Sequence, residues 1–153
     1  MLARDIMSTT VITVDARASL ARAARLMLDH MINALPVLDE QGRLAGMIGI
    51  KDVLRVPVPS QSDSPITKWA RLEEKAALLN ETLVHDVMNR RVVSVDEAAT
   101  VIEVGALMAN RGVHPIPVMR DGRLLGVVGR ADVARALLAL AESPRDLVDA
   151  LSD

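Results

Sequence analysis

The feature that most constrains this chain is a segment that occurs twice. Residues 42–52 read Gly-Arg-Leu-Ala-Gly-Met-Ile-Gly-Ile-Lys-Asp, and residues 122–132 read Gly-Arg-Leu-Leu-Gly-Val-Val-Gly-Arg-Ala-Asp. The correspondence begins upstream, where Asp5-Ile-Met7 matches Asp86-Val-Met88, and it preserves apolar positions and turns over about fifty residues. Two copies of so long a repeat indicate a pseudo-symmetric pair of units rather than a solenoid.

Each copy predicts the element order β-α-β-β-α, and we therefore expect an α/β (α+β) protein. A helix is expected after the N-cap residue Ser19 in the first copy and after Thr100 in the second, where Thr100-x-x-Glu103 is a capping box and Gly112 ends the helix. The apolar stripe of the first helix contains Leu20, Ala23, Ala24, Met27, Leu28 and Met31. The expected strands are 11–14, 35–38 and 44–48 in the first copy and 92–95, 116–119 and 124–128 in the second, with further helices at 51–55 and 131–141.

Proline marks both the second strands and the linker. Pro36 and Pro117 are expected at a strand start or on an edge strand, because proline cannot donate to the ladder. Residues 57–65 are rich in proline and serine, and residues 66–83 after them predict a helix in which Trp69 anchors against the core or a partner subunit. We expect a first repeat at 1–56, a linker with a helix at 57–82, a second repeat at 83–141, and a C-terminal tail at 142–153 that forms a short surface helix.

Composition excludes several classes of protein. The chain has no cysteine, which excludes disulfides, thiolate metal sites and cysteine nucleophiles. A formal net charge of -2 and a single aromatic residue argue against nucleic-acid binding, although arginine is frequent. No apolar run approaches about 18 residues, and no signal peptide is evident, so we expect a cytoplasmic protein without a membrane span. No catalytic triad, P-loop or metal-ligand cluster is visible, and we expect neither an enzyme nor a metal site.

The repeated aspartates are the first candidates for a binding site. Asp52 and Asp132 each follow a short apolar strand and enter the first turn of a helix, where free backbone N–H groups can help to hold an anion or a sugar hydroxyl. The simpler alternative is that each carboxylate only stabilises its helix start, by about 1 kcal/mol. His114 similarly has two readings, as a ligand contact or as a surface histidine. Met27, Met31, Met108 and Met119 are expected in the core.

The order of these motifs resembles the cystathionine-β-synthase (CBS) domain in tandem. The matching segments are the two Asp-x-Met lead-ins, the strands that end in Val-Asp, the Leu35-Pro-Val37 and Ile116-Pro-Val118 strands, and the two Gly-x-x-Gly-x-x-Asp segments. The resemblance implies two repeats packed sheet to sheet with an inter-repeat linker helix. It also implies clefts between them that bind AMP, ADP, ATP or S-adenosylmethionine, and a homodimer.

The same resemblance implies the site residues. Asp52 and Asp132 would hold ribose hydroxyls, while the family's hydroxyl-bearing position is Gly49 in one copy and Gly129 in the other; Lys51 or Arg130 would have to substitute. Short apolar strands also offer backbone groups to a purine edge and aliphatic side chains to its faces. We expect the nucleotide-binding residues to be Thr10, Val11, Ile12, Leu35, Pro36, Asp52, Arg91, Val92, Val93, His114, Pro115, Ile116, Pro117, Arg130 and Asp132.

Two functions follow from these observations. The first is a non-catalytic regulatory, energy-sensing module that needs no cofactor and binds an adenosine-containing ligand. The alternative is a ligand-free dimerisation or interaction module acting on an unidentified effector protein, favoured by the glycines at positions 49 and 129. Nucleic-acid binding and an enzyme activity come third and fourth.

Overall fold

The computed structural model describes residues 1–56 and 65–143, and of residues 65–71 only the backbone. These residues divide into two units, each of which contains one copy of the repeat. The first-repeat unit consists of Thr10–Val92 with Asp121–Leu124. The second-repeat unit consists of Met1–Thr9, Val93–Arg120 and Leu125–Asp153.

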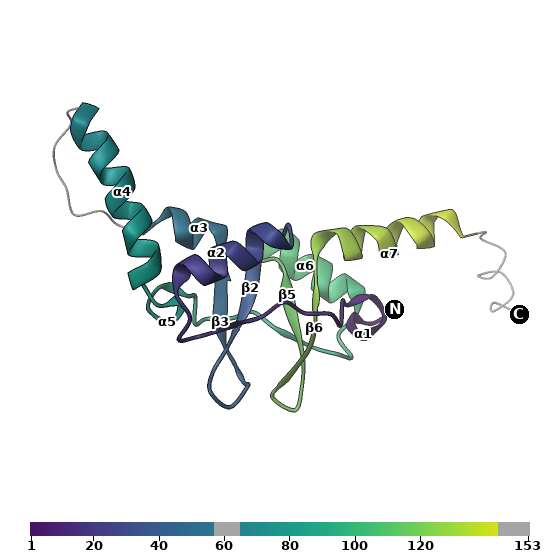
Figure 1. The fold of residues 1–153 in the computed structure, drawn as a ribbon. Coiled ribbons are helices and arrows are strands. Elements are labelled where there is room, and N and C mark those ends of the chain that lie inside the picture. Colours follow the sequence, from purple (N-terminus) through teal and green to yellow (C-terminus); the bar gives the residue numbers. More distant parts are fainter. Residues whose placement is uncertain (57–64, 144–153) are drawn as a thin grey trace, which may run out of the picture. The chain divides into compact units, whose positions relative to one another are not determined.

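The first-repeat unit is a three-stranded mixed sheet with helices packed on it (Figure 1). Its sheet order is β1-β2-β3, with β1 parallel to β2 and β2 antiparallel to β3. The elements are β1 (Val14–Asp15), α2 (Leu20–Asp29), β2 (Ala34–Leu38), β3 (Leu44–Gly49), α3 (Ile50–Leu54), α4 (Pro65–Glu81) and α5 (Val84–Val87). Helix α2 packs against β2, α3 and α4.

The second-repeat unit repeats this arrangement. Its sheet order is β4-β5-β6, and β4 is parallel to β5. The elements are α1 (Ala3–Ile6), β4 (Val95–Asp96), α6 (Val101–Arg111), β5 (Ile116–Arg120), β6 (Arg123–Val128, whose first two residues fall in the first-repeat unit) and α7 (Arg130–Glu142). The β-α-β-β-α order expected from the sequence is therefore confirmed in both copies. The expected linker helix is α4.

Both interiors are aliphatic, as a chain so poor in aromatic residues requires. Around α2 the buried residues include Leu20, Met27, Leu35, Val37 and Ile48, all with no exposed surface. Around α6 they include Val104, Ile116, Val118 and Val128, also with no exposed surface. The linker 57–64, the side chain of Trp69 and the tail 144–153 lie outside the described residues. Among the described helices, none is both long and apolar enough to span a membrane.

The first strand of each copy is shorter than predicted, and proline explains why. The sequence predicted strands at 11–14 and 92–95, but the parallel ladders contain only Val14–Asp15 and Val95–Asp96. They begin at Val14 opposite Val37 and at Val95 opposite Val118, immediately after Pro36 and Pro117, which have no N–H to donate. Strands β2 and β5, which contain these prolines, are the central strands of their sheets. The prediction that Pro36 and Pro117 could lie on edge strands is therefore wrong.

The lead-in helices α1 and α5 pack on the opposite copy from the one they precede in the sequence. Helix α5 joins the first-repeat unit, where Val84 N–H donates to the Ala18 carbonyl over 2.9 Å. Helix α1 joins the second-repeat unit, where Ala3 N–H donates to the Ala99 carbonyl over 2.7 Å. Val84 and Ala3 are fully buried in these positions. Each core is thus completed by a segment distant in sequence.

Glycines in β3 and β6 let the lead-ins approach the sheets. Asn89 and Met47 exchange N–H···O=C bonds of 2.8 and 2.9 Å, and Ser8 and Val127 exchange bonds of 2.9 and 3.0 Å. A Cβ on Gly46 would lie 2.8 Å from the Asn89 carbonyl oxygen, and one on Gly126 would lie 2.6 Å from that of Ser8. Real Cβ contacts are not this short, so only glycine fits both positions.

Helices α2 and α6 have four ends, and three of them are capped as the sequence predicts. Ser19 Oγ accepts from the Arg22 N–H over 3.1 Å, and Thr100 and Glu103 form the expected reciprocal capping box. Gly112 is left-handed, with φ 63°. The exception is Met31, which aligns with Gly112: α2 ends at Asp29, and Met31 has φ 51° and is 92% exposed. The prediction that Met31 lies in the core is therefore wrong.

We expect Met31→Gly to raise the free energy of unfolding by about 0.5–1 kcal/mol, because glycine adopts this conformation without a Cβ clash. Urea unfolding would measure the change. The matched control is Gly112→Ala, which places a Cβ in open space but in the same left-handed conformation and should lower stability by about 1 kcal/mol. A less stable Met31→Gly protein would show that the Met31 side chain makes a stabilising contact.

Candidate functional site

The repeated aspartates occupy the same place in both units. Asp52 and Asp132 lie in the first turns of α3 and α7, directly after β3 and β6. Each Oδ2 atom accepts a hydrogen bond from the backbone N–H of its N-cap glycine, over 2.7 Å from Gly49 and 2.8 Å from Gly129. The local cap predicted as the simpler alternative is therefore present, and it fixes where each carboxylate points. It leaves the Oδ1 atom of each aspartate for other partners.

The Oδ1 atoms of the two aspartates have different partners. Asp132 Oδ1 accepts from Arg135 Nη1 over 3.1 Å, in an ion pair whose side chains are 26% and 73% exposed respectively. Within the part of the chain that the structure describes, the bond from Gly49 is the one polar contact that the Asp52 side chain makes. Arg135 was not among the predicted site residues. Its i,i+3 spacing from Asp132 was the available signal.

The two glycines at the family's hydroxyl position have extended backbones. Gly49 has φ -128° and Gly129 has φ -96°, conformations open to any residue. A Cβ on Gly49 would lie 3.3 Å from the Asn33 carbonyl oxygen, whereas the neighbour of a Cβ on Gly129 would be Asp132 Oδ2, also at 3.3 Å. Both contacts are tight, but the second is with a side chain rather than with backbone.

The start of β2 lies beside Asp52. Ala34 pairs with Gly49 across the sheet, and the Asn33 carbonyl accepts from the N–H of Ile50 over 2.9 Å. Leu35 and Pro36 follow on β2, so the structure brings them to the same sheet end as α3. A ligand at this end would meet the aspartate and the backbone at the start of β2 together.

The predicted site residues differ in how far their side chains are accessible. Thr10, Arg91, His114 and Arg130 are exposed; Val11, Ile12, Val92, Val93, Pro115, Asp52 and Asp132 are half-buried; Leu35, Pro36, Ile116 and Pro117 are buried. Leu35 and Ile116 belong to the hydrophobic cores, so their side chains are already packed against protein. Arg91 and Val92 align with the first strand of the second copy, yet they fall in the first-repeat unit.

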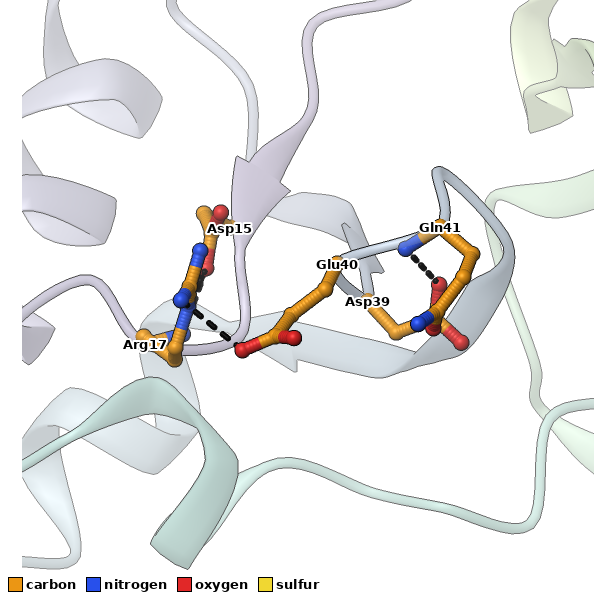
Figure 2. A network of polar contacts seen from close by, with 5 residues as sticks. All are labelled: Asp15, Arg17, Asp39, Glu40 and Gln41. Atoms are coloured by element: carbon orange, nitrogen blue, oxygen red, sulfur yellow. Dashed lines mark hydrogen bonds and ion pairs between the residues drawn. The ribbon is translucent and has the colours of Figure 1, made fainter.

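A second polar cluster lies at the hairpin end of the first sheet, at the opposite end from Asp52. Figure 2 shows Arg17 reaching Glu40, with Nη1 and Oε1 2.8 Å apart, and Gln41 N–H donating to Asp39 Oδ1 over 2.9 Å. The backbone N–H of Arg17 and then its side chain hold the pKa of Asp15 below its usual value. Hydrogen bonds from Arg43, the backbone one first, do the same to the pKa of Asp39. These carboxylates are satisfied by local partners, which makes the cluster a support for the hairpin.

The described residues contain no group of three or more acidic or histidine side chains that would hold a metal ion. The Asp52 and Asp132 ends each offer a fixed carboxylate acceptor and strand-end backbone groups.

Solved structures of known proteins share this fold. CBSX2 from Arabidopsis thaliana, solved in complex with AMP, is 23% identical; the match covers 92% of this chain and 99% of that one, with a TM-score of 0.74. The CBS domain pair of protein MJ0100, solved with 5′-methylthioadenosine and S-adenosyl-L-methionine, is 27% identical, with coverage of 92% and 98% and a TM-score of 0.67.

Among sequence relatives, L-aspartate semialdehyde sulfurtransferase of Methanocaldococcus jannaschii is 29% identical over 135 residues. The match covers 88% of this chain but 23% of that enzyme, so the chain spans less than a quarter of its length. The CBS domain model matches residues 3–58 and 84–139, most of the chain. The chain therefore belongs to the CBS domain family, with two CBS domains in tandem.

Proposed function

We propose that this protein is a non-catalytic regulatory module that binds an adenosine-containing ligand at its repeated aspartates. The observation that carries the proposal is the duplicated geometry of Asp52 and Asp132, whose carboxylates are fixed by glycine N–H bonds of 2.7 and 2.8 Å. A carboxylate held in this way is a preorganised acceptor for the two hydroxyls of a ribose. The MJ0100 pair, which was solved with two adenosine derivatives, supports this ligand class.

Binding would act through a shift in population. A ligand that contacts one conformation of the module better than another raises the population of the first by its difference in affinity. A partner protein that recognises that conformation would then respond to the ligand. AMP, ADP, ATP and S-adenosylmethionine are the candidate ligands.

Titration calorimetry with these four molecules and adenosine would test the proposal. The decisive variant is Asp52→Asn with Asp132→Asn, because an asparagine oxygen can still accept the glycine N–H and so keep the cap. We expect binding by the wild-type protein and a loss of at least ten-fold in affinity in the double variant, since an amide provides a weaker, uncharged acceptor for the ribose hydroxyls.

Asp5→Asn is the matched control. Asp5 Oδ2 accepts from Leu2 N–H over 2.7 Å at the start of α1, the same local contact made away from the repeated aspartates. This variant should bind like the wild type. Equal binding by the wild type and the double variant would refute the role of the two aspartates, and no binding of any of the molecules would refute the proposed ligand class.

The second candidate function is a ligand-free homodimer or interaction module. The glycines at positions 49 and 129 favour it, and so do exposed leucines on α7: Leu137, Leu138 and Leu140 are 52%, 56% and 57% exposed. Sedimentation equilibrium of the wild type and of Leu138→Glu would separate the two functions. A dimer that forms without nucleotide and is lost in this variant supports the second.

A further inference from the structure

The two repeated aspartates differ in whether the arginine three residues later forms an ion pair with them. Helix α7 runs from Arg130 to Glu142, so Arg135 lies within it, one turn after Asp132. Helix α3 ends at Leu54, and the residue that matches Arg135, Arg55, is its C-cap. Side chains three residues apart face each other when both residues are helical. Arg135 forms this ion pair with Asp132, whereas among the described residues Arg55 forms none with Asp52, although its backbone is also αR and its N–H donates to the Lys51 carbonyl over 3.0 Å.

We propose that Arg135 competes with the ligand for Asp132, so that the two copies bind the same nucleoside unequally and the Asp52 site fills first. The inference rests on the proposed function, because it concerns the same two carboxylates. In both copies the glycine N–H occupies Oδ2. The Oδ1 atom is thus the less occupied acceptor for a ribose: in Asp52 it accepts no bond from any residue that the structure describes, and in Asp132 it accepts from Arg135.

The size of the effect follows from the exposure of the pair. The Arg135 side chain is 73% exposed, and ion pairs this accessible to solvent contribute little. Displacing Arg135 should weaken nucleoside binding at Asp132 by about two- to five-fold. Salt screens such a pair, so high ionic strength should reduce the difference between the sites.

Adenosine is the appropriate probe, since it carries the ribose without a phosphate. A nucleotide would obscure the competition, because a guanidinium released from Asp132 can pair with a phosphate. The Asp52→Asn protein isolates the Asp132 site, and calorimetry would compare it with the same protein carrying Arg135→Gln. We expect Arg135→Gln to raise the affinity for adenosine about two- to five-fold.

Arg55→Gln in the Asp132→Asn protein is the matched control and should leave adenosine affinity unchanged. Raising the salt concentration should strengthen adenosine binding to the Asp52→Asn protein and not to its Arg135→Gln derivative. Circular dichroism would verify that α7 remains folded in each variant.

An unchanged or lower affinity after Arg135→Gln would overturn the inference, and a lower affinity would make Arg135 a ligand contact. Equal affinities of the Asp52→Asn and Asp132→Asn proteins would also overturn it. Failure of the proposed function looks different: the wild type would bind neither adenosine nor any nucleotide, and the inference would fall with it.

Discussion

Replacing Ile116 with alanine is expected to lower the free energy of unfolding by about 2–5 kcal/mol. Ile116 begins β5, has no exposed surface, and packs in the core that contains Val118 and Val128. The substitution removes buried carbon atoms and leaves a cavity in an aliphatic interior. Equilibrium unfolding in urea, followed by circular dichroism, would measure the change.

Ile102 provides the control for this prediction. It has the same side chain but is 79% exposed on α6. Ile102→Ala should change stability by no more than about 0.5 kcal/mol, and alanine's higher helix propensity favours a small gain. Equal losses in the two variants would contradict the core position of Ile116.

The Ile116 variant also bears on the site. Ile116 and Leu35 were predicted as nucleotide-binding residues, but both side chains are packed in a core with no exposed surface. Any contact that they make with a ligand in this conformation is through the backbone. Ile116→Ala should therefore weaken binding only as far as it unfolds the protein, and ligand affinity measured well below the unfolding transition should match the wild type.

Gly126→Ala is the second substitution with a large expected effect. An added Cβ would lie 2.6 Å from the Ser8 carbonyl oxygen and 2.8 Å from Met7 Sδ. The lead-in would have to move away from β6, and the paired hydrogen bonds between Ser8 and Val127 would lengthen or break. We expect a loss of about 1–3 kcal/mol in the free energy of unfolding, as in other overpacked sites.

Gly105→Ala tests whether the expected loss of stability in Gly126→Ala comes from the close approach of Ser8 and Met7 to Gly126. Gly105 lies inside α6, and its Cβ would meet Val133 Cγ1 at 3.4 Å, an ordinary contact. Alanine is the better helix former, so this variant should be up to about 1 kcal/mol more stable than the wild type. Hydrogen exchange should show faster exchange of the Ser8 and Val127 amides in Gly126→Ala alone. Unchanged exchange at these two amides would contradict the proposed cause.

Features that depend on neighbouring residues were predictable. The helix starts at Ser19 and Thr100 and the left-handed end at Gly112 follow from contacts within four residues. Met31 was not predictable in this way, because the apolar spacing of α2 continues past the residue at which the helix ends. The late starts of β1 and β4 were not predicted, although Pro36 and Pro117 are visible in the sequence. Their effect depends on the register of the two parallel ladders, which the sequence does not show.

In the candidate site, too, the contacts between neighbouring residues were predictable and the packing between distant segments was not. The repeat identified Asp52 and Asp132, and the capping bonds to Gly49 and Gly129 are contacts between residues three apart. The i,i+3 spacing is the same in both copies, so spacing by itself did not show that Arg135 pairs with Asp132 while Arg55 forms no such pair with Asp52 among the described residues. The burial of Leu35 and Ile116 could not, since it depends on which helices cover each sheet.

By itself, the sequence determined that the chain is a duplication, that each copy runs β-α-β-β-α, and that an aspartate opens the last helix of each. These are properties of periodicity and of short-range hydrogen bonding, which residues close in the chain decide together. Only the tertiary structure decided that α1 and α5 complete the opposite cores, and that Gly46 and Gly126 must lack a Cβ to admit them. Those facts depend on packing between segments far apart in sequence, where no local pattern specifies the partner.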